Sequence, residues 1–296
     1  MSEGQGTTTD WIVDRVLRGM IGAARALPFE RRVPAFAAMN ARVISPLAGY
    51  GRRALANLQM IYPERRAEWH RETAQAAVYN AGRVMIENYS NPTFMERAAR
   101  FEVRGNGFAA IRAAQAEGRP VVLATGHFGN YEAGRAALLA RGLPAGGLYR
   151  PMSNPYFNAH YRQTMEIMGP PVFPQGRRGT MGLLRHLQGG GMAVLLTDVH
   201  VPGAPFFNFL GKPARTALSA AELAIKRDAL LVPFYATRLN GGLEYRVELE
   251  PPVDPASAEA MTRSLVDSLE ARITAHPGQW FWVHRRWKGA PEGAVL

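Results

Sequence analysis

Apolar and polar positions divide the chain into two parts with different periods. In the first hundred residues, apolar positions recur every three to four residues, which predicts helices over residues 11–27, 35–60 and 66–89. From residue 101 onward, short apolar runs predict strands over residues 101–104, 120–125, 147–150, 192–197, 230–237 and 245–249. Helical patterns lie between several of these runs, over residues 109–117, 132–140, 156–168, 179–187 and 216–226. This alternation predicts an α/β fold, a mixed central sheet flanked by helices with a helical N-terminal part.

No internal repeat, low-complexity tract or linker divides the sequence. We therefore expect a single domain over residues 1–296, with residues 1–100 as the helical part and residues 101–296 as the α/β catalytic part.

The helix expected over residues 11–27 is amphipathic. It begins after Asp10, a residue type that caps helices, and its arginines lie opposite an apolar stripe. The stripe contains Ile12, Val16, Met20 and Ala24, and the arginines are Arg15, Arg18 and Arg25. Two interpretations stay open: a helix that packs on the core, and a helix that lies in a membrane interface.

The charge balance favours anionic partners. With 35 Lys and Arg against 24 Asp and Glu, the formal net charge is +11, which attracts phosphates, anionic lipid or nucleic acid. The absence of cysteine excludes disulfides, thiol nucleophiles and cysteine-bound metals. Because no run of about 18 apolar residues and no signal-peptide pattern occurs, we expect neither a membrane span nor export.

The segment VVLATGHFGNYEAG, residues 121–134, carries the most informative polar side chains. A buried type of strand ends at Gly126, and His127 follows where the chain turns toward a helix, which is where α/β sheets place active-site groups. Glu132 lies five residues further on. If His127 sits in the turn before the helix, the Glu132 carboxylate can orient the imidazole and leave its other nitrogen as a base.

Several other patterns give alternative functions. A metal-dependent hydrolase would draw its ligands from His127, Glu132, His160, Asp198 and His200. None of these has H-E-x-x-H spacing, so we expect no metal; a P-loop, a G-x-S-x-G elbow and a complete dinucleotide fingerprint are lacking as well, so we expect no cofactor. The segment WFWVHRRWK, residues 280–288, would suit a nucleic-acid or lipid-binding module, a membrane interface or a final core strand.

The segment GHFGNYE resembles the H-x₄-D/E motif of glycerolipid acyltransferases, and its surroundings resemble the lipid A late acyltransferases, the lauroyl and myristoyl transferases of Gram-negative bacteria. Further blocks resemble this family in the same order, namely ALANLQMIYPE, NAGRVMIEN, LYRPMSNP, LLTDVHVPGAPFFNFLGKPARTA and LVPFYATR. The resemblance extends over most of the chain, although members of the family usually carry an N-terminal membrane span.

This resemblance implies an O-acyltransferase in which His127 is the general base and Glu132 its partner. It implies substrate-binding roles for Asn130, Arg150, Asp198, Phe207, Gly211 and Thr216. The implied partners are an acyl carrier protein or CoA thioester as donor, a lipid A precursor as acceptor, and a membrane surface but no nucleic acid. The implied location is peripheral, on the cytoplasmic face of the inner membrane.

Overall fold

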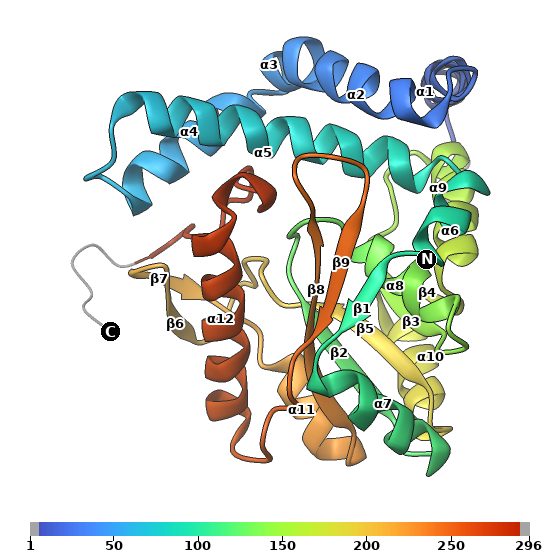
Figure 1. Ribbon diagram of the computed structural model, residues 1–296, viewed down its shortest axis with the longest axis vertical. Helices are drawn as coiled ribbons and strands as arrows, with labels where there is room; N and C mark the ends of the chain where they lie inside the picture. Colours follow the sequence, from blue (N-terminus) through green and yellow to red (C-terminus); the bar gives the residue numbers. More distant parts are fainter. Residues whose placement is uncertain (1–5, 291–296) are drawn as a thin grey trace.

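The computed structural model describes residues 6–290 and contains a seven-stranded sheet with helices on both faces (Figure 1). The strand order is β1-β9-β8-β2-β5-β3-β4, and every neighbouring pair is parallel except the antiparallel β8 and β9. The strands are β1 (Glu102–Arg104), β2 (Val121–Thr125), β3 (Ala145–Tyr149), β4 (Val172–Pro174), β5 (Met192–Leu196), β8 (Leu230–Arg238) and β9 (Tyr245–Leu249). The expected mixed α/β sheet is confirmed.

The central strand β2 is buried on both sides because helices cover each face of the sheet. Val121 and Leu123 pack beneath α7 (Asn106–Ala116) and α8 (Tyr131–Leu139). Val122 and Ala124 face α10 (Arg177–Gln188), α11 (Ser219–Arg227) and α12 (Ala258–Ala275). This two-sided burial explains the unbroken apolar run in the sequence.

The N-terminal helices form a separate layer along one end of the sheet. In Figure 1, α1, α2 and α3 lie on the outer side of α5, which crosses that end. The helices are α1 (Thr8–Arg25), α2 (Phe29–Met39), α3 (Ser45–Ala48), α4 (Tyr50–Ile61), α5 (Ala67–Asn88) and α6 (Thr93–Ala98). The layer places helical residues over the carboxyl end of β2, because Asn80 of α5 donates to the Gly129 carbonyl at 3.2 Å.

The single helix expected over residues 35–60 is wrong. The chain instead forms a π-helical turn at Asn40–Ile44, the short α3, and then α4. Gly49 ends α3 with φ of 69°, a left-handed conformation that glycine adopts without steric cost. Apolar periodicity continues across this break, so the pattern alone could not locate it.

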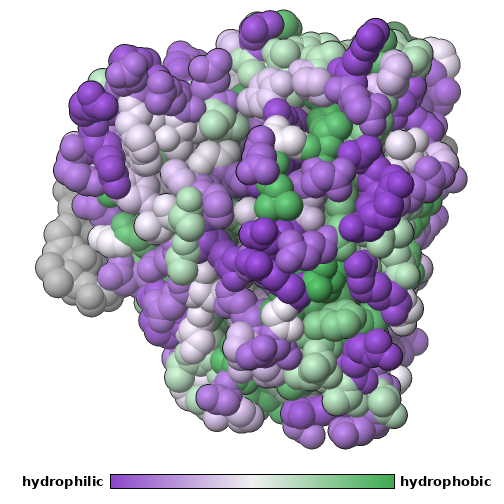
Figure 2. All heavy atoms as spheres, viewed as in Figure 1, coloured by the Kyte–Doolittle hydropathy of each residue, from purple (hydrophilic) through white to green (hydrophobic). Residues whose placement is uncertain are grey.

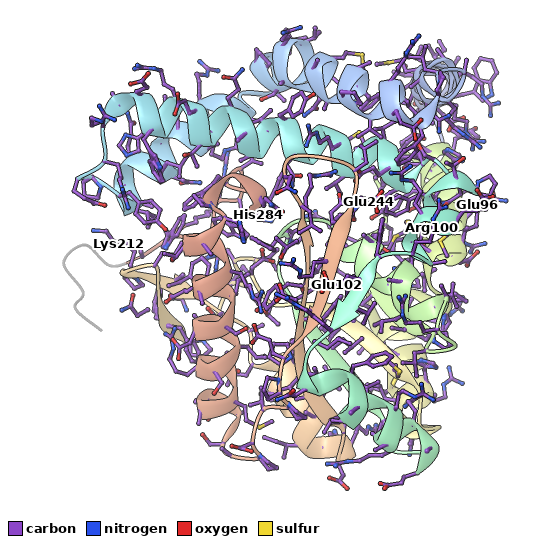
Figure 3. The ribbon with its side chains drawn as sticks, viewed as in Figure 1. Glu96, Arg100, Glu102, Lys212, Glu244 and His284 are labelled. Carbon is purple, nitrogen blue, oxygen red and sulfur yellow. The ribbon has the colours of Figure 1, made fainter. Side chains whose placement is uncertain are left out.

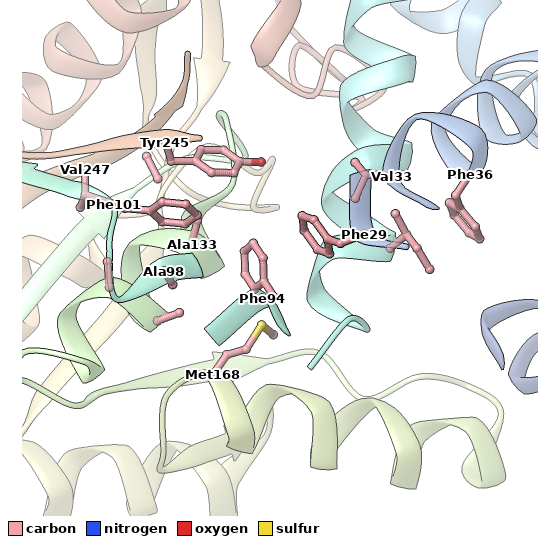
Figure 4. Packing of buried hydrophobic residues seen from close by; sticks show 14 residues of the cluster. Phe29, Val33, Phe36, Phe94, Ala98, Phe101, Ala133, Met168, Tyr245 and Val247 are labelled. Atoms are coloured by element: carbon pink, nitrogen blue, oxygen red, sulfur yellow. The ribbon is translucent and has the colours of Figure 1, made fainter. Parts of the chain in front are cut away.

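A cluster of aromatic residues joins the helical layer to the sheet. Phe29, Val33 and Phe36 of α2 belong to one buried cluster with Phe94, Phe101 and residues of β9 (Figure 4). The rings of Phe94 and Phe101 lie 6.3 Å apart at 65°, an edge-on arrangement that aromatic pairs favour. The N-terminal layer is therefore packed into the core of the molecule.

Helix α1 has one packed face and one exposed face. Thr7 rather than Asp10 is its N-cap, and Asp10 completes a capping box by accepting from the Thr7 backbone N–H at 2.9 Å. Ile21 packs with Phe157 of α9 (Pro155–Met168), whereas Val16 is 56% exposed. The core-packing interpretation therefore holds for one face of this helix, and the opposite face is exposed. Within residues 6–290 no helix is long and apolar enough to span a membrane.

Several elements escaped the sequence patterns. These are β4, α6, α12 and a hairpin of β6 (Phe206–Phe209) and β7 (Lys212–Arg215). The final core strand considered for residues 280–288 is wrong: after the 3-10 turn Pro277–Gln279, this segment folds into turns, and Trp280 makes one bridge with Phe128. Its tryptophans are buried because they pack on α4, α5 and α12 rather than in the sheet.

Candidate active site

His127 lies in the turn between β2 and α8, as expected. The turn requires glycine at two positions, Gly126 before His127 and Gly129 after Phe128. A Cβ at Gly126 would come within 2.8 Å of Leu269, and Gly129 has φ of 56° with the Ala236 carbonyl oxygen 1.9 Å from where its Cβ would be. The backbone can therefore pass close to β8 and turn sharply enough to present the imidazole at the end of the sheet.

The carboxylate that contacts His127 belongs to Asp198. This residue follows β5, the parallel neighbour of β2, so the carboxyl ends of the two strands bring both side chains together. Nδ1 of His127 lies 2.8 Å from Oδ1 of Asp198, while Oδ2 accepts from the His127 backbone N–H at 2.7 Å and from Nε1 of Trp280 at 2.9 Å. Both carboxylate oxygens are thus hydrogen-bonded, and Asp198 is 1% exposed.

These contacts keep Asp198 ionised. Burial by itself raises the pKa of the carboxyl, but the charge and hydrogen bonds of His127, together with the nearby His284, lower the pKa well below its ordinary value. An ionised carboxylate on Nδ1 fixes the tautomer of the imidazole and leaves Nε2 as the proton acceptor.

The expected pairing of His127 with Glu132 is not formed. Within residues 6–290, Glu132 makes no hydrogen bond to His127; it accepts instead from Nη1 of Arg135 at 2.7 Å. Because α8 begins at Tyr131, Glu132 is already helical, and Arg135 stands one turn further along the same helix. Arg135 is held in turn by the Ala145 carbonyl at 3.1 Å. Glu132 is therefore half of a buried ion pair.

The surroundings of Glu132 act on its ionisation in the opposite direction from those of Asp198. Burial raises the pKa of Glu132, and Arg135 offsets this only in part. Oε1 of Glu132 is buried with no hydrogen-bond partner among the residues that the structure describes. Removing either partner of such a pair leaves an uncompensated buried charge.

Asn130 is the N-cap of α8 and is fully buried. Its Oδ1 accepts from the backbone N–H groups of Glu132 and Ala133 at 3.1 and 3.4 Å. Its Nδ2 donates to Glu87, which forms an ion pair with Arg238 at 2.7 Å. The observed contacts make Asn130 a structural cap that connects α8 to α5 and β8.

A largely apolar pocket of about 410 Å³ lies between the helical layer and the sheet, and His127 is among the residues that line it. His127 and Glu132 line it, as do Tyr131 and Phe281. Residues of α1, α5 and α9 form much of the remaining wall, namely Leu17, Met20, Ile21, Ala77, Ala81, Val84, Met85, Phe157, Tyr161, Met165 and Met168, and Phe36, Ile44, Met152 and Trp280 also line it. Its size is typical of pockets that bind small or chain-like apolar ligands.

In the part of the chain that the structure describes, the residues expected to bind substrate do not line this pocket, although Asp198 contacts His127 beside it. These residues are Asn130, Arg150, Asp198, Phe207, Gly211 and Thr216. Arg150 follows β3 and is exposed. The residues Phe207 and Gly211 belong to the β6–β7 hairpin, and Oγ1 of Thr216 accepts from Nη2 of Arg286 at 2.6 Å. This hairpin packs on the C-terminal segment, where Trp287 donates to the Phe209 carbonyl at 3.2 Å.

Sequence reasoning missed His284. It lies beside the upper end of α12 in Figure 3, and its ring is 4.5 Å from that of His127 at 72°. Burial lowers the pKa of His284 to about 4, and His127 and Arg286 add to this effect. His284 lies within the aromatic, basic segment 280–288, but nothing in the pattern of that segment indicated a contact with His127.

His127, Asp198 and His284 could together hold a metal ion, since their ligand atoms all lie within 4.8 Å of one another. This set differs from the one considered from the sequence, because His284 replaces Glu132, His160 and His200. Ligation by Asp198 would, however, compete with the three donors that its oxygens already accept.

Comparison with known proteins agrees with these features. The profile of a family described as bacterial lipid A biosynthesis acyltransferase matches residues 6–289. A lipid A biosynthesis lauroyltransferase of Escherichia coli (strain K12) is 28% identical over 245 residues, which cover 80% of this chain and 78% of that protein. A phosphatidylinositol mannoside acyltransferase of Mycobacterium tuberculosis (strain CDC 1551 / Oshkosh) is 26% identical over 227 residues, which cover 72% and 69%.

A lipid A biosynthesis acyltransferase of Haemophilus influenzae (strain ATCC 51907 / DSM 11121 / KW20 / Rd) is 23% identical over 193 residues, covering 64% of this chain and 60% of that protein. Since the family profile spans nearly the whole sequence, the chain belongs to the bacterial lipid A biosynthesis acyltransferase family and is an O-acyltransferase of the lipid A type.

Proposed function

We propose that this acyltransferase moves a fatty acyl chain from an acyl carrier protein thioester to a hydroxyl of a lipid A precursor, with His127 as general base and Asp198 as its partner. One observation carries the proposal. His127, which is hydrogen-bonded to Asp198, lines an apolar pocket that can bind an acyl chain. The chain would then hold its thioester carbonyl beside the base.

The reaction needs no covalent acyl-enzyme. Nε2 of His127 takes the proton of the acceptor hydroxyl as its oxygen bonds to the thioester carbonyl carbon, and the carbonyl π electrons move to oxygen. The tetrahedral intermediate then re-forms the carbonyl and expels the thiolate. The imidazolium returns its proton to sulfur, giving an ester and a free thiol. Asp198 stabilises the transient imidazolium, as the carboxylate does in serine hydrolase triads.

The pocket supplies the binding energy for the acyl chain. Each methylene that leaves water for an apolar wall contributes about 0.8 kcal/mol, so a long chain is held far more tightly than a short one. The side chains of Met20, Met85 and Met165 contribute to the wall, and methionine adapts readily to a flexible ligand. Glu132 and Arg135 are positioning residues in this proposal, because their ion pair fixes the start of α8 beneath the pocket.

The test uses purified protein with dodecanoyl and tetradecanoyl thioesters of acyl carrier protein and of CoA. A lipid A precursor and a phosphatidylinositol mannoside serve as alternative acceptors, since named relatives of both kinds match the chain. We expect ester formation that is lost by 10³-fold or more in His127→Ala, with unchanged thermal unfolding. Failure of the wild-type protein to acylate any acceptor, or full activity of His127→Ala, would refute the proposal.

Peripheral membrane attachment forms part of the same proposal. Exposed apolar side chains gather on the outer helices, including Trp11 at 48% and Leu47 at 85% exposure, and Leu17 and Ile21 on the inner face of α1 line the pocket. Figure 2 shows a different face, over β1, β9 and α12, where hydrophilic residues are interspersed among smaller apolar areas. The outer face of α1 is thus suited to an interface from which an acyl chain or lipid could reach the pocket.

The arginines of α1 are less free than expected from the sequence. Arg15 and Arg18 lie 3.0 and 2.8 Å from the buried Asp14, and Arg25 donates to the Asn91 carbonyl. We therefore expect apolar contact to exceed electrostatic attraction. Ile12→Ser with Val16→Ser should lower flotation with vesicles of phosphatidylethanolamine and phosphatidylglycerol, and high salt should lower it less. Equal flotation of this double variant and the wild type would contradict attachment through α1.

A further inference from the structure

We propose that His284 is a second catalytic residue, which donates a hydrogen bond from its Nε2–H to the thioester carbonyl oxygen as the tetrahedral intermediate forms. This inference rests on the proposed function and assigns the oxyanion donor that the reaction requires. Neither the side chain of His127 nor that of Glu132 supplies this donor, because Glu132 accepts from Arg135 and His127 acts as the base.

His284 lies beside the end of the pocket that His127 and Phe281 line. Its ring centroid is 4.5 Å from that of His127 and 4.8 Å from that of Phe281. An acyl chain in the pocket would have its carbonyl carbon at this end. A ring nitrogen of His284 also lies within 4.8 Å of a ring nitrogen of His127, so the two imidazoles stand close enough to contact one substrate group.

Hydrogen bonds from α4 hold the backbone around His284 in place. Nδ2 of Asn57 donates to the carbonyls of Trp282 and His284 at 2.7 and 2.9 Å, and Arg53 donates to Val283 at 3.3 Å. The segment is therefore anchored to α4 on both sides of Val283. A donor that is already in place costs no reorganisation when charge develops on the substrate.

One side-chain nitrogen of His284, Nε2, is buried and has no hydrogen-bond partner among residues 6–290. An unpaired buried donor or acceptor costs roughly 1–3 kcal/mol of stability, and such atoms are frequently found where a ligand completes the site. Because burial lowers the pKa of His284 to about 4, the ring is neutral near pH 7 and carries a single N–H. A neutral donor does not repel the imidazolium that forms on His127.

The contacts among His127, Asp198 and His284 do not favour metal binding over the donor role of His284. A metal would have to displace the hydrogen bond between Nδ1 of His127 and Oδ1 of Asp198, and Oδ2 already accepts two N–H groups. The Nε2 atom of His284 is thus the one ring nitrogen of the pair of histidines that is buried without a partner in the described chain.

The test compares two substitutions in the full-length protein with the dodecanoyl thioester of acyl carrier protein as donor and a lipid A precursor as acceptor. His284→Phe keeps the ring packing but removes the donor, and His284→Gln restores an N–H near Nε2. We expect kcat to fall by about 10²–10³-fold in His284→Phe with the KM for the thioester nearly unchanged. His284→Gln should recover kcat to within about tenfold of wild type.

A matched control is His186→Phe. His186 bonds the Met192 carbonyl at 2.9 Å on the far side of the sheet, and its replacement should leave kcat within twofold. Thermal unfolding of each variant separates loss of chemistry from loss of fold. Wild-type kcat in His284→Phe, or equal losses in the Phe and Gln variants with normal unfolding, would overturn the donor role while leaving His127 as base. An inactive wild-type protein would instead overturn the proposed function, and this inference with it.

Discussion

Two buried carboxylates belong to the site around His127, and they differ in every property that matters for catalysis. Asp198 accepts three hydrogen bonds, contacts the imidazole directly and has a lowered pKa. Glu132 contacts Arg135, leaves one oxygen without a partner in the described chain and has a raised pKa. The carboxylate nearer in sequence therefore belongs to an ion pair with Arg135, and the distant carboxylate is the one that contacts His127.

The spacing of a motif therefore locates a residue in the fold more reliably than it predicts which groups that residue contacts. Glu132 is close to His127 in the chain and lines the same pocket, but its helix turns the carboxylate toward Arg135. Asp198 reaches Nδ1 because β2 and β5 are adjacent and parallel. The following changes separate the two roles.

The largest effect is expected from Asp198→Asn. An amide on Nδ1 cannot stabilise the imidazolium and can enforce the wrong tautomer, and the corresponding change in a serine protease triad costs about 10⁴-fold. We expect kcat for acyl transfer to fall by about 10³-fold with the KM for the thioester little altered. Steady-state kinetics measures this directly. A loss smaller than tenfold would remove Asp198 from the mechanism and return attention to Glu132.

Glu132→Gln should act first on stability. Neutralising one partner of a buried ion pair leaves Arg135 without its countercharge, so the free energy of unfolding should fall by about 3 kcal/mol. At a temperature where the variant is folded, transfer should decline less than in Asp198→Asn. Denaturant unfolding with Glu64→Gln as control is the measurement, because the exposed pair of Glu64 with Arg65 should contribute under about 1 kcal/mol. Normal stability with abolished transfer would make Glu132 catalytic.

Lowering the pH should change the stability contribution of His284 in a different pH range from those of Asp198 and Glu132. Its pKa is lowered from 6.5 to about 4, so the unfolded chain binds a proton that the folded chain excludes. The contribution of neutral His284 to the free energy of unfolding is present above pH 6.5 and is lost as the pH falls toward 4. It amounts to on the order of 3 kcal/mol in all. The groups facing the ring are His127, Asp198 and Arg286.

Because the pKa of Asp198 is lowered, this carboxyl loses its contribution to the free energy of unfolding only at still lower pH. The raised pKa of Glu132 has the opposite effect, because protonation of this carboxyl as the pH falls favours the folded protein. The measurement is therefore the difference in unfolding free energy between wild type and His284→Phe at pH 7, 5.5 and 4. This difference should shift in favour of the variant as pH falls. A difference independent of pH would show that His284 is not held neutral by the fold.

The smallest effect is expected from metal removal. Because the oxygens of Asp198 already accept three donors, we expect extended dialysis against EDTA to leave kcat unchanged. Assays before and after dialysis, with zinc added back, test this expectation. Loss of activity that zinc restores would make His127, Asp198 and His284 a metal site, and Asp198 would then be a ligand rather than an orienting base partner.

The sequence by itself determined much of the scaffold. Runs such as residues 121–125 predicted central strands because burial on both faces requires apolar residues throughout. The end of this run at Gly126 predicted the turn that carries His127, because glycine permits sharp backbone turns. Local patterns of this kind depend on a residue's own neighbours, and that is why they could be read directly.

Tertiary structure alone decided which groups meet. His127 and Asp198 are 71 residues apart, and only the pairing of β2 with β5 brings them within 2.8 Å. His284 reaches the same place because α4 anchors a C-terminal turn whose pattern suggested a strand or an exposed surface. The two faces of α1 were likewise undecided until α9 covered one of them. Periodicity fixes the face of an element, but the order of strands and the packing of helices decide what that face contacts.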